Sequence, residues 1–246
     1  MLGVLSDIGN NRDLNEDYAG FLEDDCIRFY VIADGMGGHN AGEVASKFAV
    51  EKTIEYIKSH RDACPQKELI KNAIEAANIE IYNFAQQSVD LKGMGTTITA
   101  CLVKDNILIV ANVGDSRCYA IYEDRIERVT KDHSLVQQLL DNGSITEEEA
   151  YHHPNKNIIT RAIGTSKNVE IDIFELGLEK IKKILICSDG LSNDVYENEM
   201  FEIATNNDNQ IACSKLVELS KQKGSRDNIS VIIFEGECKD DRYFTR

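Results

Sequence analysis

Apolar runs of five to seven residues recur along the chain between polar segments, and this pattern predicts short β-strands. The clearest runs are 2–6, 27–33, 184–188 and 229–234. The run 27–33 is almost continuously apolar, which indicates a strand that is buried on both faces. Further runs between polar dipeptides and tripeptides predict a β meander over residues 95 to 130: 95–103, 107–113, 117–122 and 125–129.

Helical spacing replaces the strand pattern in two parts of the chain. From Asn40 the apolar residues recur every three or four positions to about residue 57, and a second helix follows Pro65, which is well placed to start it, and continues to Phe84. Two long consecutive helices predict an antiparallel pair. Three shorter helices are expected later in the chain: 134–140, 196–206 and 210–222.

The segment 143–164 is polar and matches neither period, so we expect a partly irregular flap there, and long loops of this kind are often functional. No repeat, low-complexity tract or Gly/Ser linker interrupts the sequence. We therefore expect one domain over residues 1–235, followed by a polar tail at 236–246.

Composition narrows the class of protein. Hydrophobic residues make up 42% of the 246 and charged residues 28%, as in ordinary globular proteins, and neither a membrane span nor a secretory leader is visible. We expect a cytoplasmic protein that does not insert into membranes, with its seven cysteines reduced and mostly in the core. The net charge of −15 argues against a nucleic-acid partner, because such binding depends on Lys and Arg.

Acidic motifs follow several of the apolar runs, where a strand ends in a turn that glycine permits. They are Asn15-Glu16-Asp17, Asp34-Gly35, Ser188-Asp189-Gly190 and Asp227-Asn228. Carboxylates gathered at one rim of a sheet need a cation to hold them together. Ligand sets made only of oxygen favour Mg²⁺ or Mn²⁺ over zinc, and two such cations suit the hydrolysis of phosphate esters.

Taken in order, the motifs resemble the protein phosphatase 2C family in its compact bacterial form. They are Arg12-x-x-Asn15-Glu16-Asp17, Val31-Ile-Ala-Asp34-Gly35-Met-Gly37-Gly38-His39, Gly95-Thr96-Thr97, Val113-Gly-Asp115-Ser116-Arg117, Asp132-His133-Ser134, Thr160-Arg-Ala-Ile-Gly164, Ser188-Asp189-Gly190 and Asp227-Asn228. The resemblance implies an α+β fold, a four-layer α/β/β/α sandwich in which two antiparallel β-sheets are flanked by pairs of antiparallel helices.

The resemblance also implies a binuclear Mn²⁺ or Mg²⁺ centre. Asp34 is similar to the family's carboxylate that bridges both metals, and the Gly35 carbonyl is the matching backbone ligand. Asp189 and Asp227 look like ligands of one metal, and the acidic pair Glu16 and Asp17 lies on the side of the other, partly through water. The alternative for each carboxylate is a solvated turn residue, or for Asp34 a helix cap.

Three further positions carry over from the family. Asp115 lies where bacterial members bind a third, weaker metal, unless it only pairs with Arg117 or caps a turn. Arg12 is similar to the arginine that holds the substrate phosphate, since guanidinium fits phosphate oxygens bidentately; a surface ion pair with Asp13 or Glu16 is the alternative. His39 matches the proposed general acid, and a helix-capping role is its alternative.

The implied activity is metal-dependent hydrolysis of phosphoserine and phosphothreonine in proteins, by direct attack of a water that bridges the two metals. Implied partners are phosphorylated proteins, including a cognate serine/threonine kinase and its substrates, and we expect a monomer. Two alternatives stay open: a phosphohydrolase of small phosphate esters, and a non-catalytic binding module on the same fold. One departure from the family pattern is Ser225, where the family often has a second glycine before the variable residue.

Overall fold

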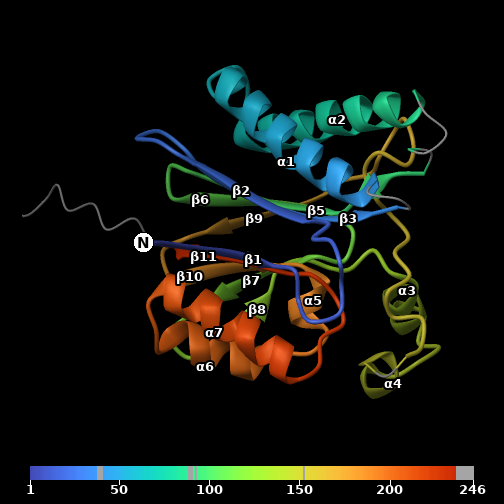
Figure 1. The fold of residues 1–246 in the computed structure, drawn as a ribbon. Coiled ribbons are helices and arrows are strands. Elements are labelled where there is room, and N and C mark those ends of the chain that lie inside the picture. Colours follow the sequence, from blue (N-terminus) through green and yellow to red (C-terminus); the bar gives the residue numbers. More distant parts are fainter. Residues whose placement is uncertain (38–40, 88–90, 92, 152, 237–246) are drawn as a thin grey trace, which may run out of the picture.

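Two antiparallel β-sheets lie face to face between layers of helices in the computed structural model, which describes residues 1–37, 41–87, 91, 93–151 and 153–236 (Figure 1). The predicted α/β/β/α sandwich is therefore confirmed. Among the described helices, none is both long enough and apolar enough to cross a membrane.

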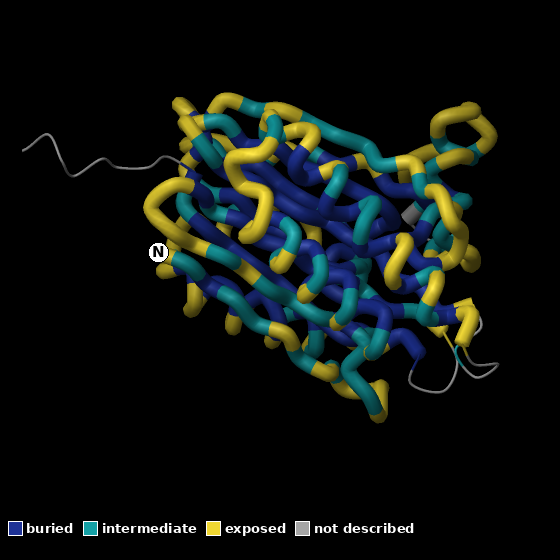
Figure 2. Tube along the Cα trace, turned by 90° about the horizontal axis from the view of Figure 1, so that it is seen from above, coloured by how far each residue is buried: buried dark blue, intermediate teal, exposed yellow. Residues whose placement is uncertain are grey.

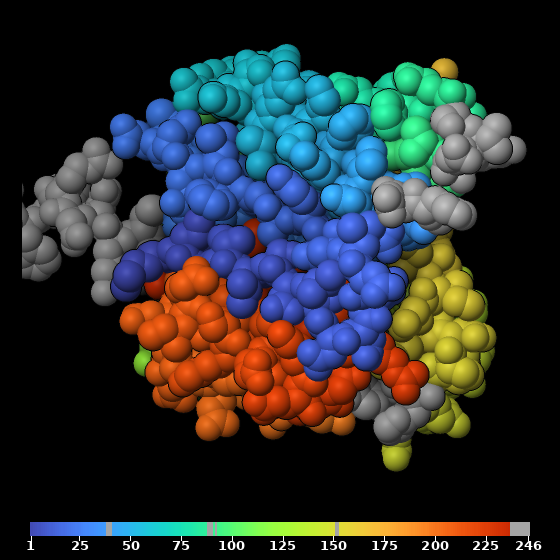
Figure 3. Space-filling view, viewed as in Figure 1, coloured from blue at the N-terminus to red at the C-terminus, as the bar shows by residue number. Residues whose placement is uncertain are grey.

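The first sheet joins the two ends of the described chain. Its strand order is β1-β11-β10-β7-β8, and every neighbouring pair is antiparallel. The strands are β1 (Leu2–Asp7), β7 (Arg117–Ile121), β8 (Ile126–Arg128), β10 (Lys183–Cys187) and β11 (Ile229–Glu235). On the face shown in Figure 3, the blue N-terminal residues accordingly lie against the orange and red C-terminal part.

The second sheet is built from strands between residues 17 and 177. Its order is β2-β3-β5-β6-β9, with the short β4 paired to the end of β3. The strands are β2 (Asp17–Glu23), β3 (Arg28–Met36), β4 (Gly95–Thr96), β5 (Ile98–Lys104), β6 (Ile107–Val113) and β9 (Asp172–Gly177).

Helices cover the outer face of each sheet. The predicted long pair, α1 (Ala41–His60) and α2 (Gln66–Ala85), packs on the second sheet, while α5 (Asp189–Ser192), α6 (Glu197–Thr205) and α7 (Asn209–Gln222) pack on the first. The flap contains α4 (Glu147–Tyr151) and follows α3 (Leu135–Asp141), and both helices lie at one side of the sandwich. The helix α4 within this segment was not predicted from the sequence.

Alternating side chains bury both faces of the central strands, as the run 27–33 predicted. On β3, Phe29 faces the α1–α2 layer, whereas Tyr30 faces the other sheet. On β11, Phe234 also points between the sheets, and its ring stacks on Tyr30 with centroids 3.8 Å apart. The buried trace in Figure 2 runs through these strands, with exposure concentrated at loops. Burial of this kind is the main force that holds the layers together.

Two strands escaped prediction. β2 has a glycine at its centre, β9 is interrupted by Glu175, and many side chains of both strands are only partly buried, so neither gives a signal as clear as that of β3 or β11. Of the cysteines in the described residues, Cys101, Cys118, Cys187 and Cys213 are buried and unpaired, as expected for core thiols.

Candidate active site

Two carboxylates face each other across neighbouring strands of the second sheet. Asp17, the first residue of β2, is the direct cross-strand partner of Asp34 near the end of β3. Threonine contacts fix Asp34: its backbone N–H donates to Thr97 Oγ1 (3.0 Å), and its carbonyl accepts from the Thr97 N–H (2.9 Å). The sequence motifs therefore place two like charges side by side at one end of this sheet.

Gly35 is required by the close approach of three chain segments. A Cβ there would lie 2.1 Å from the Gly42 carbonyl oxygen and 2.6 Å from the Glu16 carbonyl oxygen. The Gly35 N–H donates to that same Glu16 carbonyl (3.0 Å). β3 continues through this position to Met36, so the turn expected after Asp34 is not there, and only a residue without a side chain lets the Glu16 segment and the start of α1 pack this closely against the strand.

Ser188 connects the two sheets at the site. It follows β10 in the first sheet, and its hydroxyl donates a 2.7 Å hydrogen bond to Asp17 Oδ2 in the second. The Ser188 Oγ also accepts a hydrogen bond from the backbone N–H of Ser230 (2.9 Å), and the two bonds together fix the rotamer of Ser188. The next residue, Asp189, begins α5 and accepts from Asn193 Nδ2 through Oδ2 (2.9 Å). Asp17 and Asp189 are thereby brought to the same end of the sandwich.

Arg12 and Asp227 form an ion pair at the edge of the site. Arg12 Nη2 lies 2.8 Å from Asp227 Oδ2, and Nη1 lies 3.7 Å from Glu16 Oε2. The ion pair with Glu16 that was the alternative role for Arg12 is thus present, but the shorter contact is with Asp227. The Arg12 side chain remains 44% exposed, which leaves it open to a ligand.

Asn228 holds the loop that carries Arg12 and Glu16. Its Nδ2 donates to the carbonyls of Ile8 (2.9 Å) and Leu14 (3.0 Å), and its Oδ1 accepts from the Glu16 N–H (2.9 Å). A single buried amide therefore links the end of the chain to its beginning. The Asp227-Asn228 motif marked this position in the sequence, but the hydrogen bonds of the asparagine can be seen only in the tertiary structure.

Ser225, the departure from the family pattern, is accommodated. It is buried, and its hydroxyl donates to the Gly190 carbonyl (2.9 Å), which also accepts from Ser220 Oγ (2.7 Å). Gly190 itself has no room for a side chain, because a Cβ would lie 2.0 Å from the Asn228 carbonyl oxygen. The serine thus supports the turn on which Asp189 and Asp227 depend.

Asp115 lies in the loop between β6 and β7 and is 8% exposed. Burial raises the pKa of its carboxyl well above the ordinary value, with further increases from Asp189 and Asp132, while Arg117 opposes them. No described hydrogen bond joins Asp115 to Arg117, whose guanidinium instead binds Asp132. Asp115 is therefore close enough to Asp189 for their charges to interact. The resemblance implies that these two residues would hold the third metal together.

Burial and mutual repulsion raise the pKa of the central carboxyls. Burial raises the pKa of Asp17 to about 7 and that of Asp189 to about 6, with Asp227 adding to both. For Asp34, burial followed by Asp17, Asp189 and Asp115 raises the pKa well above its ordinary value. Burial likewise raises the pKa of Glu16. A nearby cation would offset the free-energy cost of ionising these buried carboxyls.

The carboxylates fit a hard divalent cation. Asp17 Oδ1 and Asp189 Oδ1 are buried without a hydrogen-bond partner, and buried acceptors of that kind need a ligand. The donor set is oxygen alone, as Mg²⁺ and Mn²⁺ prefer. Across the described residues, no three His, Cys, Asp or Glu side chains form a ready-made ligand cluster, so the carboxylates would have to converge on the metal. The predicted general acid His39 lies outside the described residues.

These motifs and this fold define a protein phosphatase. The sequence profile of the family described as Protein phosphatase 2C matches residues 9–218. The chain belongs to that family, whose members in general depend on Mn²⁺ or Mg²⁺. The resemblance drawn from the motifs is confirmed.

Individual relatives agree with this assignment over nearly the whole chain. The serine/threonine phosphatase stp of Listeria innocua is 38% identical over 94% of this chain and 93% of its own length, and protein phosphatase PhpP of Streptococcus pneumoniae is 36% identical over 94% and 96%. The crystal structure of serine/threonine phosphatase Stp1 from Staphylococcus aureus is 37% identical, with a TM-score of 0.87 over 96% of this chain and 95% of that one.

Proposed function

We propose that this protein is a metal-dependent serine/threonine phosphatase that hydrolyses phosphoserine and phosphothreonine in proteins. The observation that carries the proposal is the joining of Asp17, Asp34 and Asp189 at one end of the sandwich, with buried carboxylate oxygens that lack partners. Relatives of similar length are named serine/threonine phosphatases. A binding module without catalysis would have no need to keep such mutually repelling acids.

The acidic residues would hold the metals, two Mn²⁺ or Mg²⁺ ions and a third, weaker one. The set is Asp34, Gly35 through its carbonyl, Asp189, Asp227, Glu16 and Asp17 for the pair, with Asp115 for the third. When bound, such ions make a water molecule easier to deprotonate and neutralise the charge on phosphate oxygens. Ser188 keeps Asp17 in place, and Asn228 keeps the Glu16 loop in place.

Arg12 would bind the substrate phosphate. Its planar guanidinium can donate two parallel hydrogen bonds to phosphate oxygens, and its exposed position at the edge of the acidic cluster lets a protein-borne phosphate reach it. Asp227 orients the guanidinium through the 2.8 Å contact. In a chain with a net charge of −15, a fixed cation beside the metals is needed to receive a dianionic phosphate.

The substrates would be phosphorylated proteins, among them a cognate serine/threonine kinase and the targets of that kinase. His39 as the general acid, a monomeric state, one domain over residues 1–235 and a cytoplasmic location stay predictions. The alternative of a phosphohydrolase for small esters has no support among the named relatives, which are called protein phosphatases.

The test is phosphate release from a phosphothreonine peptide under three conditions: with Mn²⁺, with EDTA, and with Mn²⁺ and the Asp189→Asn variant. Release only in the first condition supports the proposal. Release that survives both EDTA and the substitution would show that the acidic motifs are structural. A nucleotide and a sugar phosphate, assayed in parallel, separate a protein phosphatase from a hydrolase of small esters.

A further inference from the structure

The direction of the Asp115 carboxylate is set by the backbone that carries it, because among the described residues no hydrogen bond joins that carboxylate to another residue. Asp115 follows Gly114, which has a φ of +112°, a conformation that glycine adopts readily. Asp115 and Asp189 line the same cavity, of about 610 Å³, so the two predicted ligands border one space. Whatever holds the peptide groups of Gly114 therefore decides whether Asp115 can share a cation with Asp189.

His133 binds both peptide groups that flank Gly114. The Gly114 N–H donates to His133 Nδ1 (3.1 Å), and the Gly114 carbonyl accepts from the His133 N–H (2.9 Å). The second of these peptide groups leads directly into Asp115. His133 is only 7% exposed, so bulk water offers little replacement for either bond. The ring and the backbone of His133 together hold the turn from which Asp115 projects.

The partners of the imidazole fix which of its nitrogens carries the proton. A backbone N–H can only donate, so Nδ1 is the acceptor and the proton of the neutral ring is on Nε2. Nε2 lies 3.1 Å from Asp172 Oδ2 on β9. Arg161 Nη1 lies 3.1 Å from the same nitrogen and donates to Asp172 Oδ1 (2.8 Å). Asp172 thus orients the ring so that Nδ1 faces Gly114.

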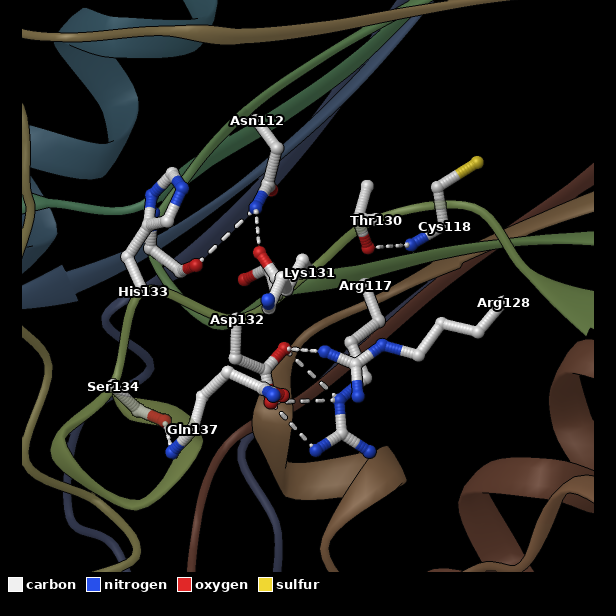
Figure 4. Close-up of polar contacts among 12 residues, drawn as sticks. Asn112, Arg117, Cys118, Arg128, Thr130, Lys131, Asp132, His133, Ser134 and Gln137 are labelled. Atoms are coloured by element: carbon white, nitrogen blue, oxygen red, sulfur yellow. Dashed lines mark hydrogen bonds and ion pairs between the residues drawn. The ribbon is translucent and has the colours of Figure 1, made fainter. Parts of the chain in front are cut away.

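The segment that carries His133 is itself held from two sides (Figure 4). On one side, the fully buried Asn112 donates through Nδ2 to the carbonyls of Gly114 and Lys131 (both 3.2 Å). On the other side, the Asp132 carboxylate pairs with two guanidinium groups, those of Arg117 on β7 and Arg128 on β8. The position of the His133 ring is therefore determined by its neighbours before any ligand binds.

The residue after Asp115 is anchored separately. The Ser116 hydroxyl lies 2.9 Å from Thr97 Oγ1, and the Ser116 carbonyl accepts from Thr99 Oγ1 (3.0 Å). Loss of the His133 ring would free the Gly114 side of the loop and leave the Ser116 side attached. Asp115 could then turn away from Asp189 without unfolding of the loop.

We propose that His133 is a positioning residue for the third, weaker metal. Its Nδ1 atom, acting through the peptide groups of Gly114, directs the Asp115 carboxylate toward the space shared with Asp189. This inference rests on the proposed function, because it requires Asp115 to be a metal ligand. It also gives a role to the Asp132-His133-Ser134 motif, which includes none of the proposed metal ligands and not the phosphate-binding Arg12.

The test uses two substitutions that each keep one half of the imidazole. In His133→Asn the amide oxygen takes the place of Nδ1 and can accept from the Gly114 N–H, whereas in His133→Gln the amide reaches the place of Nε2 and leaves no acceptor at Nδ1. Titration calorimetry with Mn²⁺ should show an affinity for the third ion about tenfold lower or more in His133→Gln, as is typical when a group that orients a ligand is lost. The affinity of His133→Asn should stay near that of the unmodified protein.

A matched control and two further measurements separate positioning from a general structural role. His60→Gln is the control, because the exposed His60 ring stacks on Tyr56 of its own helix. In the metal-free protein, the Gly114 amide hydrogen should exchange slowly in the unmodified protein and in His133→Asn, and faster in His133→Gln. If His133 acts through Asp115, the double variant Asp115→Asn, His133→Gln should have the same kcat with Mn²⁺ as Asp115→Asn alone.

Each outcome bears on one claim. Equal affinities of the two His133 variants for the third ion would overturn the inference, and so would additive losses of kcat in the double variant. Thermal melting in EDTA shows whether each variant is folded; if His133→Gln is not, a lowered affinity in the folded His133→Asn would still overturn the inference. An unmodified protein that binds two Mn²⁺ ions only, and releases phosphate, would refute the inference and support the proposed function. Absence of Mn²⁺-dependent phosphate release from the unmodified protein would overturn the proposed function itself.

Discussion

Asp17 lies directly opposite Asp34 in the antiparallel pair of β2 and β3. Like charges at directly opposed positions destabilise a sheet, and here burial adds to the penalty. The hydrogen bond from Ser188 to Asp17 reduces the cost for one carboxylate only. The pair is thus a locally unfavourable arrangement that a divalent cation would convert into a favourable one.

Replacement of Asp34 by Asn should have opposite effects on stability and on catalysis. In EDTA, Asp34→Asn should melt at a higher temperature than the unmodified protein, because about 1 kcal/mol of relieved repulsion corresponds to roughly 2–4 °C in a chain of this size. Its turnover with Mn²⁺ should fall at least about a hundredfold, since a charged ligand is lost. Asp62→Asn, at an 81% exposed side chain, is the control. Near-normal turnover of Asp34→Asn would exclude Asp34 as a ligand.

The stability of the metal-free protein should fall as the pH rises. Asp17 and Asp189 have pKa values of about 7 and about 6 in the folded protein, above the ordinary value of 3.8. The folded state therefore holds protons that the unfolded state releases, so their contribution is complete below about pH 4 and is lost as the pH passes 6 and 7. Melting curves in EDTA should show a lower Tm at pH 8 than at pH 5, and excess Mn²⁺ should reduce the difference. A Tm in EDTA that is equal or higher at pH 8 would contradict the assigned shifts.

Arg12→Lys should lower kcat/KM for a phosphothreonine peptide by about tenfold or more, because an ammonium keeps the charge but cannot form the bidentate contact. The melting temperature should change little, since the Arg12 ion pair is exposed and such pairs contribute little stability. Arg61→Lys is the control, because Arg61 pairs with Asp24, beyond the opposite end of β2. Equal effects of the two substitutions on kcat/KM would show that Arg12 does not bind the substrate phosphate.

Ser188→Ala should weaken metal binding without removing a ligand. The substitution deletes the 2.7 Å hydrogen bond from the Ser188 hydroxyl that fixes Asp17 Oδ2. Loss of a group that orients a ligand typically costs about 10- to 100-fold in metal affinity. Titration calorimetry with Mn²⁺ measures the change directly. Ser214→Ala, on the exposed face of α7, should leave the affinity unchanged.

Gly190→Ala should destabilise the protein and reduce activity together. The new methyl group would lie 2.0 Å from the Asn228 carbonyl oxygen, so α5 or the Asp227 segment must move. Overpacking of this kind costs about 1–3 kcal/mol or more, which thermal unfolding measures. Gly177→Ala is the matched control, because its Cβ would meet mainly the end of the flexible Glu179 side chain. A variant at Gly190 as stable as that control would show that the contact relaxes freely.

The sequence predicts those parts of the fold whose apolar pattern is unambiguous. β3, β10 and β11 are continuous apolar runs because both of their faces are buried, and α2 keeps one apolar face over its whole length. β2 and β9 lie at the two edges of the second sheet, where partial exposure permits polar residues, so their pattern is weak.

Site residues were predictable where a motif carries them, and their contacts were not. The positions of Asp17, Asp34 and Asp189 follow from strand ends that the motifs mark. The bond from Ser188 to Asp17 spans 171 residues of sequence, and the pairing of Arg128 with Asp132 is one of many that a charged hairpin could form. Such contacts depend on how the two sheets and the flap are packed together, which no local pattern specifies.

The pairing of β1 with β11 also determines the order in which the parts of this enzyme can fold. The second sheet is complete once residue 177 has been made, so most of one half can fold during synthesis. β1, however, pairs only with the strand that begins at Ile229, and Asn228 must be present to position the Glu16 loop. A nascent chain on the ribosome would therefore have no phosphatase activity until its last strand emerged.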